Sequence, residues 1–129
     1  MSLADYSGKK KVISILPSLD TPVCATSTQK FNAELADKTD VQLLIVSGDL
    51  PFAAGRFCEA NSAGATTTLS TMRNQDFAKD YGVLMADGPL EGLTARAVLV
   101  LDEDNKVIHA ELVPEIAQEP NYESALASL

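Results

Sequence analysis

The pattern of apolar and polar residues predicts alternating strands and helices along the chain. An apolar run from Val12 to Leu16 predicts a first strand, and the residues after Pro22 mix polar and apolar positions as an amphipathic helix does. Val41 to Val46 is apolar except for Gln42, which suits a strand buried on both faces of a sheet. Further along, the pattern predicts a helix over 51–60, a strand over 66–69, a helix over 74–81, a hairpin of strands over 95–101 and 106–113, and a last helix over 122–129.

The order of these elements predicts an α/β fold. Strand–helix–strand units imply parallel strands joined by right-handed crossovers, and the hairpin adds antiparallel strands at one edge. We therefore expect a mixed central sheet with helices on both faces, which is the thioredoxin-like fold class. The chain has 129 residues and shows no internal repeat or linker, so we expect a single domain over residues 1–129.

Charge and hydropathy narrow the possible partners. The chain carries 10 basic and 18 acidic residues, which gives a net charge of −8. An acidic surface argues against binding to nucleic acid or to anionic membranes. No apolar run approaches the roughly 20 residues that span a bilayer. Residues 1–5 do not form a basic stretch followed by an apolar one, so no signal peptide is visible, and we expect a cytoplasmic protein. Lys9 to Lys11 form a charged flank before the first strand.

The segment from Pro17 to Cys24 joins the first predicted strand to the first predicted helix. Pro22 fits the first turn of a helix, and Thr21 suits the N-cap, where its hydroxyl can accept a hydrogen bond from a free backbone N–H group. Cys24 therefore falls in the first turn, where the helix dipole favours a thiolate. The alternative interpretation is a buried structural cysteine.

The cysteine count limits the chemistry further. Two cysteines and one histidine cannot supply the four protein ligands of a structural zinc site, and we expect no metal and no organic cofactor. The two cysteines do not form a CxxC motif, and they are too few for a disulfide scaffold. A reversible, functional disulfide is the expectation that remains.

Pro17, Thr21 and Cys24 stand at the spacing PxxxTxxC, which is the active-site signature of peroxiredoxins. The whole stretch Pro17–Cys24 closely resembles the version found in the bacterial thiol peroxidase (Tpx) subfamily of atypical two-cysteine peroxiredoxins. The resemblance continues, in order, through Asp49–Ala53, Arg56–Cys58, Leu69–Thr71, Tyr81–Val83, Ala86–Leu90 and Gly92–Val98. Chains of this subfamily usually carry an N-terminal segment with a β-hairpin before the first core strand, and we expect that hairpin to be missing here.

The resemblance implies a role for each of five residues. Cys24 would be the attacking thiolate, Thr21 would place its hydroxyl beside the sulfur and the peroxide, and Pro17 would shield the sulfur from water. Arg96 matches the active-site arginine of the family. Cys58 matches the resolving cysteine, which implies an intrachain Cys24–Cys58 disulfide. From the residues alone, an exposed arginine at a strand end is the favoured interpretation of Arg96, and the resemblance reverses it. The alternative interpretation of Cys58 is a buried helix residue.

A disulfide requires its two Cα atoms to lie within about 7 Å of each other. Cys24 and Cys58 are expected at the starts of separate helices, and we do not expect them to meet this requirement in the reduced fold. The first turn at Cys24 and the helix at Cys58 are therefore predicted to unwind locally during turnover.

By resemblance, the protein is a thiol-dependent peroxidase. The family implies hydrogen peroxide and alkyl hydroperoxides as substrates, thioredoxin as the reductant and a homodimeric assembly. Two alternatives stay open at this point. A general thiol–disulfide oxidoreductase is disfavoured by the absence of a CxxC motif. A shortened, inactive relative that acts as a redox-sensing or binding module is favoured by the short N-terminus and disfavoured by the intact Pro17, Thr21, Cys24 and Arg96.

Overall fold

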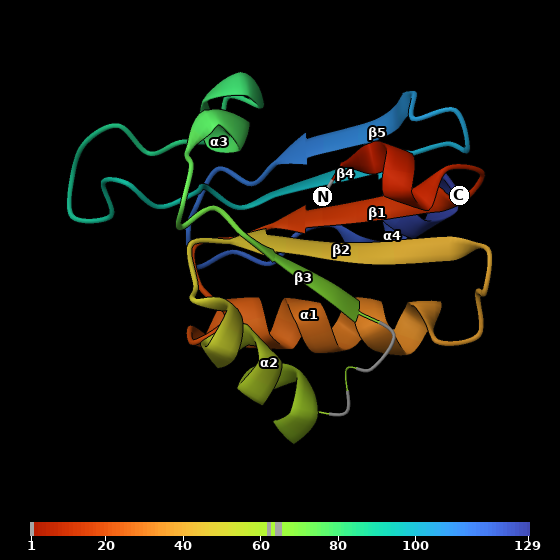
Figure 1. The fold of residues 1–129 in the computed structure, drawn as a ribbon, viewed down its shortest axis with the longest axis horizontal. Helices are drawn as coiled ribbons and strands as arrows, with labels where there is room; N and C mark the ends of the chain where they lie inside the picture. The colour runs from red at the N-terminus through yellow and green to blue at the C-terminus, as the bar shows by residue number, and fades with distance from the viewer. Residues whose placement is uncertain (1, 62, 64–65) are drawn as a thin grey trace.

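The computed structural model describes residues 2–61, 63 and 66–129. Within these residues, a five-stranded sheet is combined with helices (Figure 1). The strands are β1 (Lys10–Ile15), β2 (Val41–Ser47), β3 (Thr66–Ser70), β4 (Ala97–Leu101) and β5 (Val107–Leu112). The helices are a 3-10 turn η1 (Leu3–Tyr6) and the α-helices α1 (Pro22–Leu35), α2 (Pro51–Ala60), α3 (Asp76–Asp80) and α4 (Tyr122–Ala127).

The sheet is mixed, as the order of the predicted elements implies. Its strand order is β3-β2-β1-β4-β5, so the first strand of the chain lies in the middle. β1, β2 and β3 run parallel, and β4 is antiparallel to both β1 and β5. Val12 of β1, for example, pairs with Leu43 of β2 and with Val100 of β4. This topology brings the carboxyl ends of β1 and β2 to one edge of the sheet.

One face of the sheet carries the larger core and is covered by α1 and α4. Phe31 of α1 is fully buried there, and its ring meets the ring of Tyr122 edge-on, with 5.0 Å between the ring centres. Cys24 belongs to the same buried cluster, and Phe57 of α2 packs against it. The sheet side chains of this cluster are Val12, Leu43, Ile45, Val98 and Val100.

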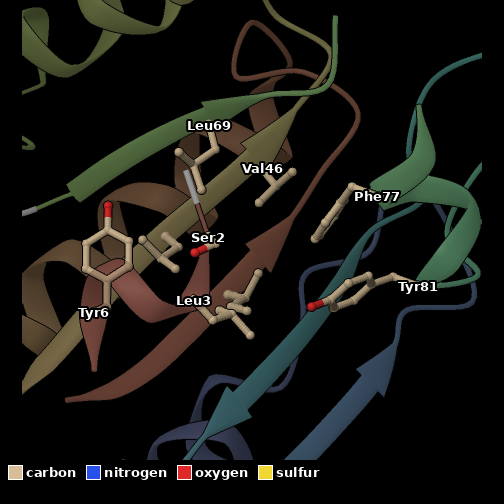
Figure 2. Close-up of a pocket in the computed structure, with 9 residues that line it drawn as sticks. Ser2, Leu3, Tyr6, Val46, Leu69, Phe77 and Tyr81 are labelled. Carbon is tan, nitrogen blue, oxygen red and sulfur yellow. The ribbon is translucent and has the colours of Figure 1, made fainter. Parts of the chain in front are cut away.

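The opposite face is covered by η1 and α3, so helices lie on both faces as predicted. Leu3 and Tyr6 of η1 and Phe77 of α3 pack against this face, although the sequence pattern does not predict η1. An apolar cavity of about 280 Å3 remains between them and the sheet (Figure 2). At its margin the rings of Phe77 and Tyr81 stack, with 4.2 Å between their centres.

Lys11 departs from the charged flank predicted for Lys9 to Lys11, because it belongs to β1 and is fully buried. Side chains alternate along a strand, so Lys11 points to the same face as Ile13 and Ile15. Its ammonium group donates a hydrogen bond to the carbonyl oxygen of Lys9 at 2.8 Å. The aliphatic part of the side chain therefore covers the sheet while the charged end remains hydrogen-bonded.

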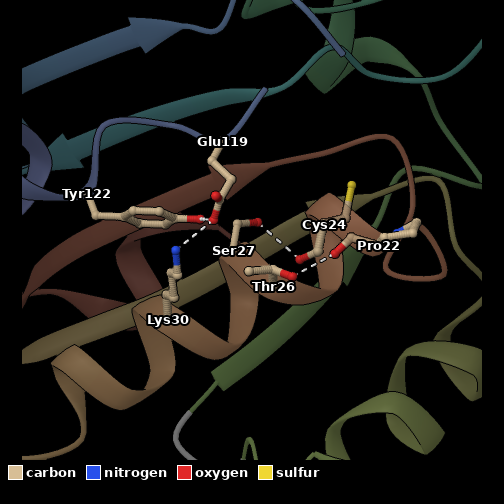
Figure 3. Close-up of polar contacts among 7 residues, drawn as sticks. All are labelled: Pro22, Cys24, Thr26, Ser27, Lys30, Glu119 and Tyr122. Carbon is tan, nitrogen blue, oxygen red and sulfur yellow. Dashed lines mark hydrogen bonds and ion pairs between the residues drawn. The ribbon is translucent and has the colours of Figure 1, made fainter. Parts of the chain in front are cut away.

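Glu119 connects the C-terminal part of the chain to α1. One of its oxygens, Oε1, accepts hydrogen bonds from Lys30 Nζ and from the Tyr122 hydroxyl, each at 2.9 Å (Figure 3). Burial, together with the hydrogen bond to Glu119, raises the pKa of Tyr122 above the usual tyrosine range. The proton of Tyr122 is therefore held more strongly in the folded chain than in the unfolded chain.

This raised pKa predicts a contribution to stability that depends on pH. The contribution is fully present below about pH 10, where a tyrosine in an unfolded chain begins to ionise, and it is lost as the pH rises further towards the folded-state pKa. Between about pH 9 and pH 11, the free energy of unfolding of the wild-type protein should therefore fall more steeply than that of Tyr122→Phe. Urea denaturation across this range measures both slopes, with Tyr81→Phe as the control. Equal slopes for wild type and Tyr122→Phe would contradict this role of Tyr122.

Candidate active site

The loop between β1 and α1 is fixed at its start by neighbours on both sides. The backbone N–H of Leu16 donates to the carbonyl oxygen of Val46 in β2 at 3.0 Å. The carbonyl oxygen of Leu16 accepts a hydrogen bond of 2.7 Å from the hydroxyl of Thr94, a residue with 1% of its surface exposed. The chain therefore enters the loop from a rigid position in the middle of the sheet.

Thr21 is the N-cap residue of α1, as predicted, but its hydroxyl does not cap the helix. Instead, Thr21 Oγ1 donates to the carbonyl oxygen of Ser18 at 3.1 Å, and the backbone N–H of Thr21 points to the same oxygen at 3.3 Å. The tight turn from Ser18 to Thr21 draws the hydroxyl back into the loop. Because a hydroxyl has a single proton to donate, Thr21 Oγ1 keeps its lone pairs as acceptors for another group.

Cys24 is the third residue of α1 and has no exposed surface. The hydroxyls around it bond back to carbonyl groups of the first turn: Thr26 Oγ1 donates to Pro22 O at 2.9 Å, and Ser27 Oγ donates to Cys24 O at 3.0 Å (Figure 3). Such bonds compete with the regular helical pattern and weaken a helix slightly. These two bonds therefore favour local opening of the first turn of α1.

Three of the residues singled out from the sequence share one pocket. This pocket has a volume of about 340 Å3 and mostly apolar walls. Residues that line it include Pro17, Thr21, Val23, Leu93, Arg96 and Ile116. Cys24 directly follows the lining residue Val23 in α1. The structure thus brings Pro17, Thr21 and Arg96 together beside the helical turn that carries Cys24.

Arg96 is buried, with 3% of its surface exposed, so the alternative of an exposed arginine at a strand end is wrong. It directly precedes β4, and its Nη2 donates to the carbonyl oxygen of Ile116 at 2.8 Å. Its Nε and Nη1 are buried and have no hydrogen-bond partner among the described residues. Unpaired charged donors are costly to bury, and here they belong to a residue that lines the pocket. They are suited to bind a thiolate or a peroxide oxygen.

Asp49 is a site residue that the sequence reasoning did not single out. Its carboxylate accepts hydrogen bonds from Ser18 Oγ at 2.6 Å, from the backbone N–H of Leu19 at 2.7 Å and from Ser47 Oγ at 2.8 Å. Asp49 lies two residues after the end of β2, and the loop it holds follows β1. The parallel pairing of β1 and β2 indicates the role of Asp49, because the carboxyl ends of these strands meet at one edge of the sheet.

Cys58 lies on α2 and is not among the residues that line the pocket beside Cys24. The expectation that both cysteines lie at helix starts is wrong for Cys58, which stands in the last turn of α2 because that helix extends from Pro51 to Ala60. Both cysteines belong to the described part of the chain, and both are free thiols. Partial burial raises the pKa of the Cys58 thiol.

The part of the chain that the structure describes offers neither a metal site nor a membrane-spanning helix. No group of three or more His, Cys, Asp or Glu side chains there is arranged to hold a metal ion. None of the described helices combines the length and the apolar character that a membrane crossing needs.

Known proteins resemble the chain over almost its whole length. The sequence model of the redoxin family matches residues 1–126. A thiol peroxidase from Leptospira interrogans is 50% identical over 98% of this chain and 75% of its own length. A crystal structure of a peroxiredoxin-like protein from Aquifex aeolicus is 45% identical over 94% of this chain and 70% of its own, with a TM-score of 0.88. A thiol peroxidase from Chromobacterium violaceum is 25% identical over 98% of this chain and 74% of its own, with a TM-score of 0.90.

These similarities confirm the thioredoxin-like fold predicted from the order of strands and helices. They also favour a peroxidase over the two alternatives left open by the sequence, a general thiol–disulfide oxidoreductase and an inactive binding module. The chain belongs to the redoxin family and is a peroxiredoxin enzyme of the bacterial thiol peroxidase subfamily.

Proposed function

We propose that this peroxiredoxin reduces hydrogen peroxide and alkyl hydroperoxides through a Cys24 thiolate. In the same proposal, Cys58 converts the oxidised Cys24 into an intrachain disulfide, and thioredoxin reduces that disulfide. The observation that carries the proposal is the buried guanidinium of Arg96, which has two unpaired N–H groups and lines a pocket together with Pro17 and Thr21. The family relationship also supports a single domain over residues 1–129, a homodimer and a cytoplasmic location.

In the first step, the sulfur of Cys24 attacks one peroxide oxygen while the O–O bond breaks. The sulfur is oxidised to a sulfenic acid, and the other oxygen leaves as an alcohol or water once it has taken up a proton. The unpaired N–H groups of Arg96 would stabilise both the thiolate and the charge that develops on the leaving oxygen. Thr21 Oγ1, whose own proton is bonded to Ser18 O, would accept a hydrogen bond from the peroxide O–H.

The shape of the pocket supports alkyl hydroperoxides as substrates. Its walls are mostly apolar, and Leu90, Leu93 and Ile116 form part of them. An alkyl group would bury its surface there, while the peroxide group would lie toward Arg96. Because Cys24 has no exposed surface, the proposal requires a small displacement of the pocket wall or of the first turn of α1 when a peroxide enters.

In the second step, the thiol of Cys58 attacks the sulfenic sulfur of Cys24, a disulfide forms and water leaves. The raised pKa of Cys58 keeps this thiol protonated near neutral pH, so it would compete little with Cys24 for peroxide. The weakened first turn of α1 and the position of Cys58 in the last turn of α2 support local unwinding at both cysteines.

We predict different outcomes for replacement of the two cysteines. Cys24→Ser should abolish the consumption of cumene hydroperoxide and hydrogen peroxide, because it removes the nucleophile. Cys58→Ser should consume about one equivalent of peroxide per chain and then stop, because the sulfenic acid is no longer resolved. Stopped-flow assays with thioredoxin, thioredoxin reductase and NADPH measure both. Sustained turnover by Cys58→Ser at the wild-type rate would rule out its role, and turnover by Cys24→Ser would rule out the mechanism.

Replacement of Arg96 should slow the oxidation of Cys24. Arg96→Met, measured in the Cys58→Ser background, should lower the second-order rate constant with peroxide by about 10²–10³-fold, the usual cost of losing a donor to developing charge. Arg96→Lys keeps the charge but loses the planar fork of donors, so it should recover only part of the rate. Arg73→Met, which removes an exposed arginine, is the matched control and should react like wild type. A rate for Arg96→Met within twofold of that control would contradict the role of Arg96.

A further inference from the structure

Asp49 connects three parts of the molecule at the edge of the sheet. Its carboxylate holds Ser18 and Leu19 of the loop before α1, together with Ser47 at the end of β2. Its backbone carbonyl oxygen accepts a hydrogen bond of 2.5 Å from Ser70 Oγ at the end of β3. We propose that Asp49 is a positioning residue that holds the Cys24 loop in the arrangement that reacts with peroxide, and that its hydrogen bonds break when the Cys24–Cys58 disulfide forms.

A short chain of hydrogen bonds leads from Asp49 to the pocket. Asp49 fixes Ser18 through its hydroxyl, and the carbonyl oxygen of Ser18 receives both the N–H and the hydroxyl of Thr21. The position of Ser18 therefore decides where the acceptor oxygen of Thr21 lies. The second bond, from the N–H of Leu19, holds a residue that is 3% exposed and belongs to the same buried cluster as Cys24. Asp49 thus holds the first two residues of the tight turn from Ser18 to Thr21.

Asp49 is also joined by the backbone to the helix that carries Cys58. α2 begins at Pro51, two residues after Asp49, and Leu50 between them is its N-cap residue. Away from this junction, the loop and α2 are separated by a pocket of about 350 Å3, whose lining includes Asp20, Arg56 and Phe57. A movement that closes this gap between the first turn of α1 and the last turn of α2 would therefore strain the hydrogen bonds at Asp49.

The chemistry of a carboxylate is required at this position. Three donors converge on the two oxygens of Asp49, and hydrogen bonds to a charged acceptor are roughly twice as strong as neutral ones. An asparagine offers one oxygen and an NH2 group, which cannot accept the hydrogen bond from the Leu19 N–H if the oxygen faces Ser18. Asp49→Asn keeps the size of the side chain but removes its charge. With its oxygen facing Leu19 and Ser47, its NH2 group faces Ser18 Oγ, so the charge-assisted hydrogen bond that Ser18 donates is lost and Ser18 can only accept there.

The inference rests on the proposed two-cysteine mechanism and predicts opposite effects on its two steps. In the Cys58→Ser background, Asp49→Asn should slow the oxidation of Cys24 by peroxide about tenfold or more, the change expected for loss of one charge-assisted hydrogen bond. With Cys58 present, the same substitution should speed conversion of the sulfenic acid to the disulfide several-fold. Stopped-flow peroxide consumption measures the first rate, and rapid quenching with a thiol-alkylating reagent followed by mass spectrometry measures the second.

Two further variants control the experiment. Asp20→Asn removes an exposed carboxylate from the same loop and should leave both rates unchanged. Ser18→Ala removes one hydrogen bond while Asp49 stays in place, and it should shift both rates in the same directions as Asp49→Asn, by less. This variant keeps the test available if Asp49→Asn does not give the wild-type circular dichroism spectrum.

The outcomes separate this inference from the function on which it rests. A fall in both rates, or no change in either, would overturn the role of Asp49, because the inference requires the two rates to change in opposite directions. If the wild-type chain forms no Cys24–Cys58 disulfide at all, the resolving step of the proposed function fails. An undiminished rate of Cys24 oxidation in Asp49→Asn would then still refute the positioning role.

Discussion

The burial of the Arg96 guanidinium beside an apolar pocket is the constraint on which the account of this site depends. A charged group with two unpaired donors is expensive to keep away from water, so the surrounding structure has to hold it in place. One contact that does so is the carbonyl oxygen of Ile116. The segment that contains Ile116 is tied to α1 and α4 by the bonds of Glu119 to Lys30 and Tyr122. Residues distant in sequence therefore help to hold the buried guanidinium of Arg96 in place.

The contacts at one edge of the sheet also set the position of the loop before Cys24. Leu16 is fixed between β2 and Thr94, and Asp49 holds the loop that follows. The first part of the loop is therefore anchored, while the first turn of α1 is weakened by the hydroxyl groups of Thr26 and Ser27. A fixed loop followed by a weakened helical turn suits both steps of the proposed reaction. In the proposed mechanism, the peroxide step needs fixed geometry, and formation of the disulfide needs movement.

Much of the fold follows from local patterns in the sequence. The apolar runs predict the strands, and the helix predicted over 51–60 is α2 with the same bounds, since Pro51 marks its first turn. Side-chain behaviour that depends on distant contacts is not predicted in this way. The sequence predicts Lys11 as part of a charged flank, but its position in β1 places its side chain in a buried site. η1 has no clear periodicity, and its contacts with the far face of the sheet exist only in the folded chain.

The candidate site was predicted in part, for similar reasons. The PxxxTxxC spacing predicts Pro17, Thr21 and Cys24 as candidate residues, and the structure places Pro17 and Thr21 in one pocket beside the turn with Cys24. The burial of Arg96 depends on a segment about 20 positions further along the chain. Asp49 is visible only once β1 and β2 are paired in parallel, because nothing in its own neighbourhood marks it as a partner of the loop.

The identity of the cysteine that peroxide oxidises first is the central claim, and chemical trapping tests it most directly. Cys58→Ser would be treated with one equivalent of hydrogen peroxide in the presence of dimedone, which reacts with sulfenic acids, and then digested for mass spectrometry. The account predicts the adduct on the peptide that contains Cys24. In the wild-type chain, the same treatment should yield the Cys24–Cys58 disulfide in its place. A Cys24 that remains an unmodified thiol while peroxide is consumed would contradict the account.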